Sequence, residues 1–320
     1  MWFKSLHQAN ISKQLFIVVL FWLITNLIIL GLSSIIFKIF PDFATQYNVY
    51  MEEINRLILT LNHEKDIPEQ LIVMGKEIKQ NLNNSFFYSI ILFQSLYNVL
   101  NYGVLAIILR KLLFQKTVLP YRNLKLPVLI ITVLLFFAAM PILNESIKLN
   151  EYLGLDKLDL QAEESSYSVL LTTYSLVVDS NINHQIIIIL CMALIPAIGE
   201  ELFFRGVLQK ILSEKIDFHV AILVASILFS LFHFELVAFF YRFLFGVILG
   251  YLYYYTKNIF PSILLHFINN FTSIIALNYA PNLTEINNSD SFPTSVLIFS
   301  CFSLAFIFYT LHLYNQQAKD

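Results

Sequence analysis

Long apolar stretches separated by short polar segments make up most of this chain of 320 residues. A helix needs about 20 apolar residues to cross the hydrocarbon core of a bilayer. Eight stretches approach this length, and we expect each to form a helix: 14–38, 85–109, 126–143, 185–205, 218–234, 236–255, 259–278 and 293–314. The pattern therefore predicts an all-α, polytopic membrane protein with about eight transmembrane helices.

Two longer polar segments lie between these stretches. The segment 41–84 contains an apolar repeat from Ile54 to Leu61, which is typical of an amphipathic helix outside the membrane or at its surface. The segment 144–183 is rich in acidic residues and is predicted to be a loop. The chain then divides into N-terminal helices with two extracytoplasmic segments, a core of helices four to seven, and a loop with a C-terminal helix: 1–183, 184–278 and 279–320.

Composition and charge agree with a membrane protein and suggest its orientation. The chain is 58% hydrophobic and 13% charged, whereas soluble domains carry roughly 25% charged residues. The net charge is −2, and no basic patch indicates a nucleic-acid partner. The basic residues after the second stretch, from Arg110 to Lys125, are typical of a cytoplasmic loop. With an even number of helices, both termini are predicted to be cytoplasmic, and the composition favours a bacterial inner membrane.

Two adjacent carboxylates and a guanidinium interrupt the fourth apolar stretch, in the sequence Pro196-Ala-Ile-Gly-Glu200-Glu201-Leu-Phe-Phe-Arg205. An ionisable group near the bilayer centre costs roughly 2.5–3.5 kcal/mol on insertion scales, so such groups usually pair with one another and mark a functional site. On a helix, Glu201 and Arg205 lie on one face in the favourable order for an ion pair. Glu200 points about 100° away from Glu201, which leaves it available for chemistry.

Two histidines lie inside apolar stretches. His233 ends the sequence Phe229-Ser-Leu-Phe-His233, and His266 precedes Asn270 by one helical turn. Taken alone, each histidine fits an interhelical hydrogen bond as well as it fits catalysis. The set is more specific, because together these groups suit hydrolysis. A carboxylate or imidazole can take a proton from water, and a second imidazole and an amide can assist the reaction. The same set, through Glu200 and the two histidines, suits a Zn²⁺ site with an open position for water, so both chemistries stay open.

The two histidines lie at different depths by simple counting. His233 comes near the outer end of its helix, whereas His266 comes near the inner end of its own. A common site then requires tilted helices, offset depths or a broken helix. Pro196 and Gly199 would break the fourth helix just before Glu200, since non-helical backbone is tolerated in a membrane where it lines a wet cavity. We therefore expect such a break and a water-filled cavity beside it.

The spacing of these residues resembles the CPBP family of CAAX prenyl endopeptidases and bacteriocin-processing or bacteriocin-immunity enzymes, also called the ABI family. Three motifs in the family's order carry the resemblance: Glu200-Glu201-x-x-x-Arg205, Phe229-x-x-x-His233 and His266-x-x-x-Asn270. The resemblance covers roughly 184–275, which are the fourth to seventh helices.

The resemblance implies an intramembrane endopeptidase. Glu200 would activate water together with His233, while His266 and Asn270 would bind or polarise the scissile carbonyl. The residues implied to support the site are Glu201, Arg205 and Phe229. The family is often labelled metalloprotease, and a glutamate-activated water without metal is also proposed, so a Zn²⁺ cofactor is left open. The expected partners are the lipid bilayer and a membrane-associated peptide or protein, such as a prenylated CAAX-type or bacteriocin-like substrate.

Two other functions use the same residues. A non-catalytic membrane scaffold or immunity protein would bind a peptide or partner through this fold. A transporter or proton channel would use the carboxylates and imidazoles as a proton relay. The sequence shows no inverted repeat and no paired broken helices, which argues against a transporter.

Overall fold

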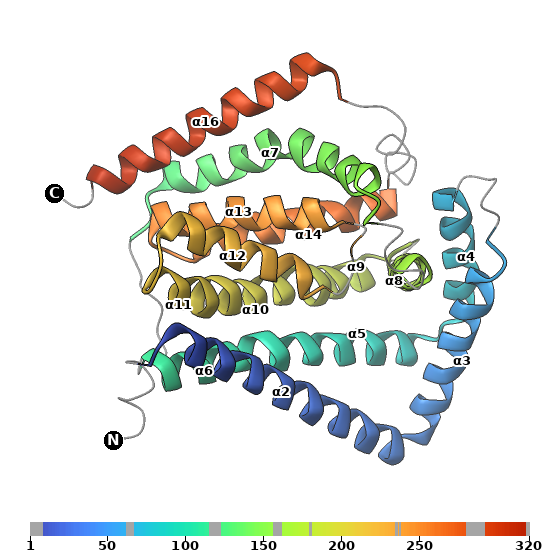
Figure 1. The fold of residues 1–320 in the computed structure, drawn as a ribbon. Coiled ribbons are helices and arrows are strands. Elements are labelled where there is room, and N and C mark those ends of the chain that lie inside the picture. The colour runs from blue at the N-terminus through green and yellow to red at the C-terminus, as the bar shows by residue number, and fades with distance from the viewer. Residues whose placement is uncertain are drawn as a thin grey trace.

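Helices make up the described part of this computed structural model, which covers residues 9–61, 67–114, 123–155, 162–178, 181–233, 236, 238–279 and 292–317. These residues contain no β-strand. Most of the helices lie side by side along one common direction, and a smaller group lies across one end (Figure 1). The prediction of an all-α fold is confirmed.

Six helical stretches of the described residues are long and apolar enough to cross a membrane. Two of them are continuous rods built from several segments. The first rod joins α5 (Asn84–Asn98), η1 (Val99–Val104) and α6 (Leu105–Phe114). The second joins α9 (Ile182–Ile188), η3 (Ile189–Leu194), α10 (Ile195–Phe203), η4 (Phe204–Gln209) and α11 (Lys210–Ser213). The other four are α2 (Ile11–Ile39), α7 (Leu126–Tyr152), α14 (Phe260–Tyr279) and α16 (Thr294–Gln317).

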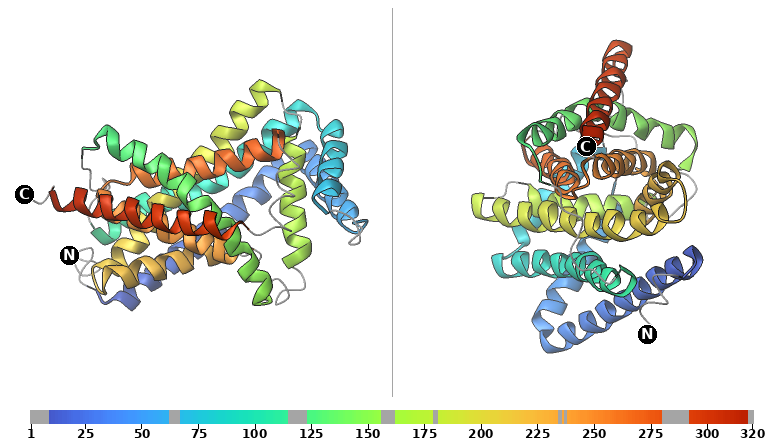
Figure 2. Two further views of the ribbon diagram at one scale, coloured as in Figure 1. Left: turned by 90° about the horizontal axis from the view of Figure 1, so that it is seen from above. Right: turned by 90° about the vertical axis from the view of Figure 1, so that its left-hand side faces the viewer.

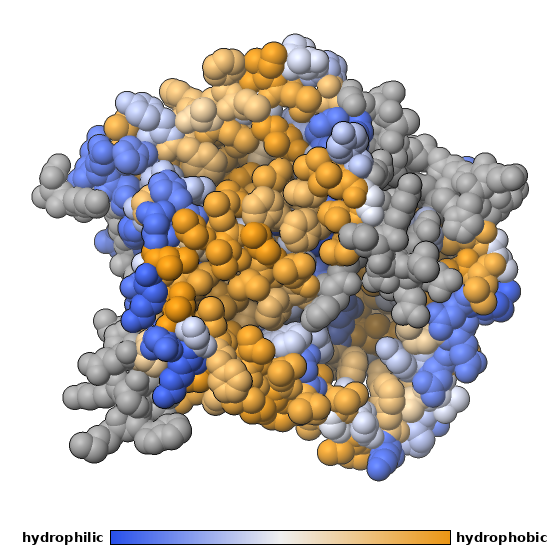
Figure 3. Space-filling model, in the orientation of Figure 1, coloured by the Kyte–Doolittle hydropathy of each residue, from blue (hydrophilic) through white to orange (hydrophobic). Residues whose placement is uncertain are grey.

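These stretches define a multi-pass membrane protein. Figure 3 shows apolar residues over a broad middle band of the surface, with hydrophilic residues towards its two ends. Many large apolar side chains are exposed there, as contact with lipid allows. The rod that runs through α10 lies in the middle of the bundle, with α2 and α16 on opposite flanks (Figures 1 and 2).

The fifth and sixth predicted helices are present as α12 (Phe218–Leu231) and α13 (Phe239–Thr256), but neither is among the six long apolar stretches. α12 has 14 residues. At about 1.5 Å per residue it is about 21 Å long, which is less than the hydrocarbon core of about 30 Å. All eight predicted helices therefore exist, whereas full crossings are supported for six of them.

Three helices form a cap over one end of the bundle: α3 (Pro41–Ile58), α4 (Ile67–Asn81) and α8 (Ala162–Val177). α4 and α3 both pack against α8. The amphipathic helix predicted in 41–84 is confirmed, although it is two helices with their apolar faces turned inward. The prediction of a loop over 144–183 is wrong, because α7 continues to Tyr152 and α8 follows. Leu171 and Tyr174 of α8 are buried among residues of α3 and α4, so its apolar side faces protein rather than lipid.

Candidate active site

The two adjacent glutamates lie on α10, within the continuous rod from Ile182 to Ser213. The predicted break at Pro196 and Gly199 is absent. Pro196 lies inside the continuous rod, two residues after the end of η3, which is π-helical, so the missing N–H of the proline falls next to a turn that is already widened. Gly199 serves packing instead, since a Cβ atom at this position would lie 3.2 Å from the Cβ of Tyr102 on η1.

The rod departs from α-helical geometry on both sides of α10 rather than within it. The segments η3 and η4 are π-helical, and they directly precede and follow α10. Such wide turns are rare and are frequent at functional sites. The rod therefore stays hydrogen-bonded through the apolar interior while its backbone is widened next to the glutamates.

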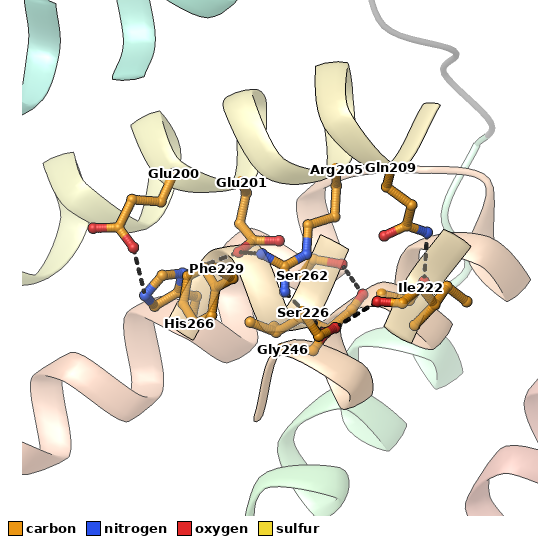
Figure 4. A network of polar contacts seen from close by, with 12 residues as sticks. Glu200, Glu201, Arg205, Gln209, Ile222, Ser226, Phe229, Gly246, Ser262 and His266 are labelled. Carbon is orange, nitrogen blue, oxygen red and sulfur yellow. Dashed lines mark hydrogen bonds and ion pairs between the residues drawn. The ribbon is translucent and has the colours of Figure 1, made fainter. Parts of the chain in front are cut away.

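Glu201 and Arg205 form the predicted ion pair. Oε1 of Glu201 lies 3.0 Å from Nη1 of Arg205, and both side chains are almost fully buried. Nη2 of Arg205 also donates a hydrogen bond of 2.9 Å to the carbonyl oxygen of Gly246 on α13. The guanidinium lies over the ring of Phe229, 4.9 Å from its centroid. Figure 4 shows this network, in which Arg205 joins α10 to α12 and α13.

His266 of α14 lies between the two glutamates. Its Nδ1 is 3.1 Å from Oε1 of Glu201, and its Nε2 is 3.9 Å from Oε2 of Glu200 (Figure 4). A carboxylate oxygen accepts hydrogen bonds, so Nδ1 carries a proton in this arrangement. Nε2 is then an acceptor if the ring is neutral and a donor if the ring is an imidazolium.

His233 approaches Glu200 from the turn that follows α12. Its Nδ1 lies 2.8 Å from the carbonyl oxygen of Phe229, which makes Nδ1 the donor and leaves Nε2 as the acceptor. Nε2 is 3.9 Å from Oε2 of Glu200. Both imidazoles therefore reach the same carboxylate oxygen, although His233 follows the end of α12 and His266 lies in the second turn of α14.

Two imidazoles thus lie near Oε2 of Glu200. Both distances of 3.9 Å exceed the range of a hydrogen bond, and this buried oxygen has no hydrogen-bond partner among the described residues. A buried acceptor without a partner is costly, so the site suits a small polar species that donates protons, such as water. Such a molecule would bridge Glu200 and Nε2 of His233.

A metal ion would need several of these groups as ligands. In the part of the chain that the structure describes, no three His, Cys, Asp or Glu side chains are arranged to hold one. The open question of Zn²⁺ at Glu200, His233 and His266 therefore gains no support from the geometry, and no chemical step below passes through a metal.

Asn270 lies one turn beyond His266 on α14. Its Nδ2 is 3.5 Å from the carbonyl oxygen of Ala193 on η3, and its Oδ1 is 3.4 Å from Nδ2 of Asn269. The hydroxyl of Tyr241 on α13 donates a hydrogen bond of 2.7 Å to Oδ1 of Asn269. Neither Tyr241 nor Asn269 is among the site residues predicted from the sequence.

Two glycine carbonyls on α13 are a further feature that motif reasoning missed. Gly246 accepts from Arg205, and Gly250 accepts a hydrogen bond of 3.1 Å from Nε2 of Gln209. Arg205 and Gln209 are four residues apart, and so are Gly246 and Gly250. The rod and α13 therefore turn one face towards each other. The signal in the sequence is the Gly-x-x-x-Gly spacing, which is typical of close helix packing in membranes.

The fold and the site together define a multi-pass membrane protein in which two glutamates, an arginine and one histidine are buried and a second histidine, His233, is partly accessible beside them. Residues 182–272 match the family model described as Type II CAAX prenyl endopeptidase Rce1-like. This agrees with the CPBP resemblance of the three motifs, and every candidate residue lies inside the matched segment, which is less than a third of the chain. No curated protein and no solved structure matches the chain.

Proposed function

We propose that this protein is an intramembrane endopeptidase, which hydrolyses a peptide bond of a membrane-associated substrate. The observation that carries the proposal is the convergence of His233 and His266 on Oε2 of Glu200, at 3.9 Å each, inside an apolar helical bundle. The family match of residues 182–272 supports a CAAX-type peptidase. A prenylated CAAX-type protein or a bacteriocin-like peptide is the substrate class that we propose.

His266 lies between two carboxylates, and the proposed mechanism uses it as an imidazolium. Its positive charge faces Glu200 and Glu201, Glu201 also pairs with Arg205, and the charge of Arg242 on α13 acts on His233. Buried charges are tolerated when they are paired in this way. In this form His266 donates from Nδ1 to Glu201 and presents Nε2–H to the site.

The reaction begins with a water molecule held between Glu200 and His233. Nε2 of His233 accepts one O–H, and Oε2 of Glu200 takes the other proton as the water oxygen attacks the carbonyl carbon of the substrate. The resulting oxyanion accepts hydrogen bonds from Nε2–H of His266 and Nδ2–H of Asn270. The C–N bond then breaks, and the proton held by Glu200 passes to the departing amine.

The proposed orientation places both ends of the chain in the cytoplasm of a bacterial inner membrane. The beginning of α2 and the end of α16 lie on the same side of the bundle (Figure 1). α6, which carries the basic residues Arg110 and Lys111, lies towards that side too (Figure 1). The cap of α3, α4 and α8 then lies outside, on the opposite end.

The test is cleavage by the purified full-length protein in detergent. A quenched fluorogenic peptide library, with a prenylated CAAX peptide included, is assayed with the wild type and the variants Glu200→Gln and Glu52→Gln. Loss of a general base lowers kcat by about 10²–10⁴-fold, so we expect this loss for Glu200→Gln. Glu52 is an exposed carboxylate on α3, and its substitution is expected to leave cleavage unchanged.

Two results of this assay would contradict the proposal. Cleavage by Glu200→Gln at the rate of the wild type would exclude Glu200 as the base. Peptide binding by the wild type without cleavage, and unaffected by Glu200→Gln, would instead indicate a non-catalytic scaffold. Metal analysis of the same sample, with and without chelator, tests the metal-free mechanism: stoichiometric Zn²⁺ that leaves together with activity would overturn it.

A further inference from the structure

A chain of hydrogen bonds leads from α13 to the side chain of Asn270. It begins at the hydroxyl of Tyr241, passes through the amide of Asn269 and ends at the carbonyl oxygen of Ala193, with distances of 2.7, 3.4 and 3.5 Å in that order. Tyr241, Asn269 and Asn270 are all partly buried. The mechanism above uses only Asn270 of these three residues.

The carbonyl oxygen of Ala193 determines the donor and the acceptor of every hydrogen bond in this series. The carbonyl oxygen of Ala193 can only accept, so the Asn270 side chain turns Nδ2 towards it and Oδ1 away from it. Oδ1 of Asn270 then needs a donor, which is Nδ2 of Asn269. Oδ1 of Asn269 in turn accepts from the hydroxyl of Tyr241. Each group has the partner that its chemistry requires.

The orientation of Asn270 decides what it can do for a substrate. Its Nδ2 carries two hydrogens, of which one points to Ala193 and the other remains for an oxyanion. If the amide turned over, its oxygen would face the negative charge that develops on the substrate, and stabilisation would become repulsion. One flipped amide is therefore enough to remove the proposed oxyanion donor.

We propose that Tyr241 and Asn269 are positioning residues, which hold the Asn270 amide with its N–H group towards the scissile carbonyl. This inference rests on the proposed function, because it assigns Asn270 the role of an oxyanion donor. Tyr241 and Asn269 act only through Asn270 and do not touch the reacting atoms.

The first test compares kcat and KM among single variants of the full-length protein with the peptide cleaved by the wild type. Tyr241→Phe removes one hydrogen bond, and we expect kcat to fall about 2- to 10-fold with KM unchanged. Tyr255→Phe is the matched control, because Tyr255 is on the same helix with its ring against His312 and Phe308, and its activity should equal that of the wild type.

A sharper test replaces the hydrogen-bond donor of Asn269 with an acceptor. Asn269→Asp keeps the acceptor for Tyr241 but loses the donor for Asn270, so Asn270 turns its Nδ2 towards the new carboxylate. We expect this variant to lose about 10²–10³-fold in kcat, as much as Asn270→Ala, since both remove an oxyanion donor. Asn269→Ala imposes no reversed orientation and should retain more activity than Asn269→Asp.

A double-mutant cycle separates positioning from general damage. Residues that act through one another are not additive. Tyr241→Phe should therefore have no further effect on the residual cleavage of Asn270→Ala. The proposal would be overturned if Tyr241→Phe lowered kcat as much in the Asn270→Ala background as in the wild type. It would also be overturned if Asn269→Asp were as active as Asn269→Ala.

The orientation of the Asn270 amide can also be followed by NMR in the absence of substrate. In protein with ¹⁵N-labelled asparagine, Tyr241→Phe should shift the side-chain amide signals of Asn270 as well as those of Asn269. Unchanged Asn270 signals would overturn the inference even for a protein without measurable cleavage. Failure of the proposed function appears separately, as cleavage that is insensitive to Glu200→Gln.

Discussion

Neighbouring glutamates have different environments in this site because consecutive side chains on a helix point about 100° apart. Glu201 is fully buried, and its Oε1 lies within 3.1 Å of both Nη1 of Arg205 and Nδ1 of His266. Glu200 faces the two imidazole Nε2 atoms at 3.9 Å each and has no direct donor at Oε2 among the described residues. One carboxylate is therefore held in a network, and the other remains available to a substrate or to water.

Arg205→Met tests whether the network around Glu201 stabilises the fold. The change breaks the buried ion pair of Glu201 by removing the guanidinium of Arg205, and the loss of one partner of such a pair typically costs about 3–5 kcal/mol. We expect a large fall in Tm for unfolding in detergent. Lys210→Met is the control on the same rod, because Lys210 pairs with Glu214 at a partly exposed site, where such a pair contributes about 0–1 kcal/mol. Equal Tm values for both variants would contradict the assignment of Arg205 to support of the fold.

The sequence predicted the Glu201–Arg205 pair and one shared site for Glu200, His233 and His266, because these residues are ionisable groups in apolar stretches. It could not predict the partners that are backbone atoms. The carbonyl oxygens of Gly246 and Ala193 are present in every sequence, and only the packing of the helices brings them to Arg205 and Asn270.

At the scale of elements, the close contact of α12 and α13 determines where the Gly246 carbonyl lies. A Cβ atom at Gly246 would be 3.0 Å from the Cβ and 3.2 Å from the Cα of Ser226. The absence of a side chain at this position therefore allows the two helices to approach closely enough for the carbonyl of Gly246 to accept from Arg205.

Gly246→Ala is expected to push α13 away from α12. Inserting a methyl group where backbone atoms are in the way costs about 1–3 kcal/mol, so Tm should fall and cleavage should weaken as Arg205 loses its acceptor. Gly31→Ala on α2 is the control, because nothing lies within 4 Å of the added Cβ atom. A glycine in a helix interior costs roughly 0.5–1 kcal/mol relative to alanine, so this control should be neutral or stabilising. The opposite order of Tm values would exclude the proposed role of the close contact.

Helices that face lipid were predictable from the sequence, and helices that face protein were less so. Each of the eight apolar stretches contains a helix, and the ends of α2 and α14 lie within a few residues of the prediction. α8 was missed because its first residues are acidic and its apolar side packs on α3 and α4. The expected break at Pro196 was wrong because the chain accommodates the proline with a widened, π-helical turn just before it, and the rod continues through it.

The whole molecule has two distinct ends, and the proposed orientation can be tested on them. In a protein with Cys191→Ser and Cys301→Ser, we would introduce Ser213→Cys at the end of α11 or Thr60→Cys between α3 and α4. Both positions are exposed and lie at opposite ends of the bundle. We expect a membrane-impermeant maleimide to label Thr60→Cys in right-side-out vesicles and Ser213→Cys in inside-out vesicles. Labelling of both from one side would contradict the arrangement.

The shortness of α12 also has a consequence for the lipids around the protein. Its outward face is apolar, with Val220, Leu223, Ile227 and Leu231 exposed. A membrane that meets an apolar surface shorter than its own hydrocarbon layer adapts by local thinning. A bilayer that adapts in this way is thinner beside α12, next to the turn that carries His233. For the endopeptidase proposed above, thinner lipid would shorten the distance over which a polar peptide backbone must leave the headgroup region to reach Glu200, so the shape of one helix would lower the barrier to entry for the whole substrate.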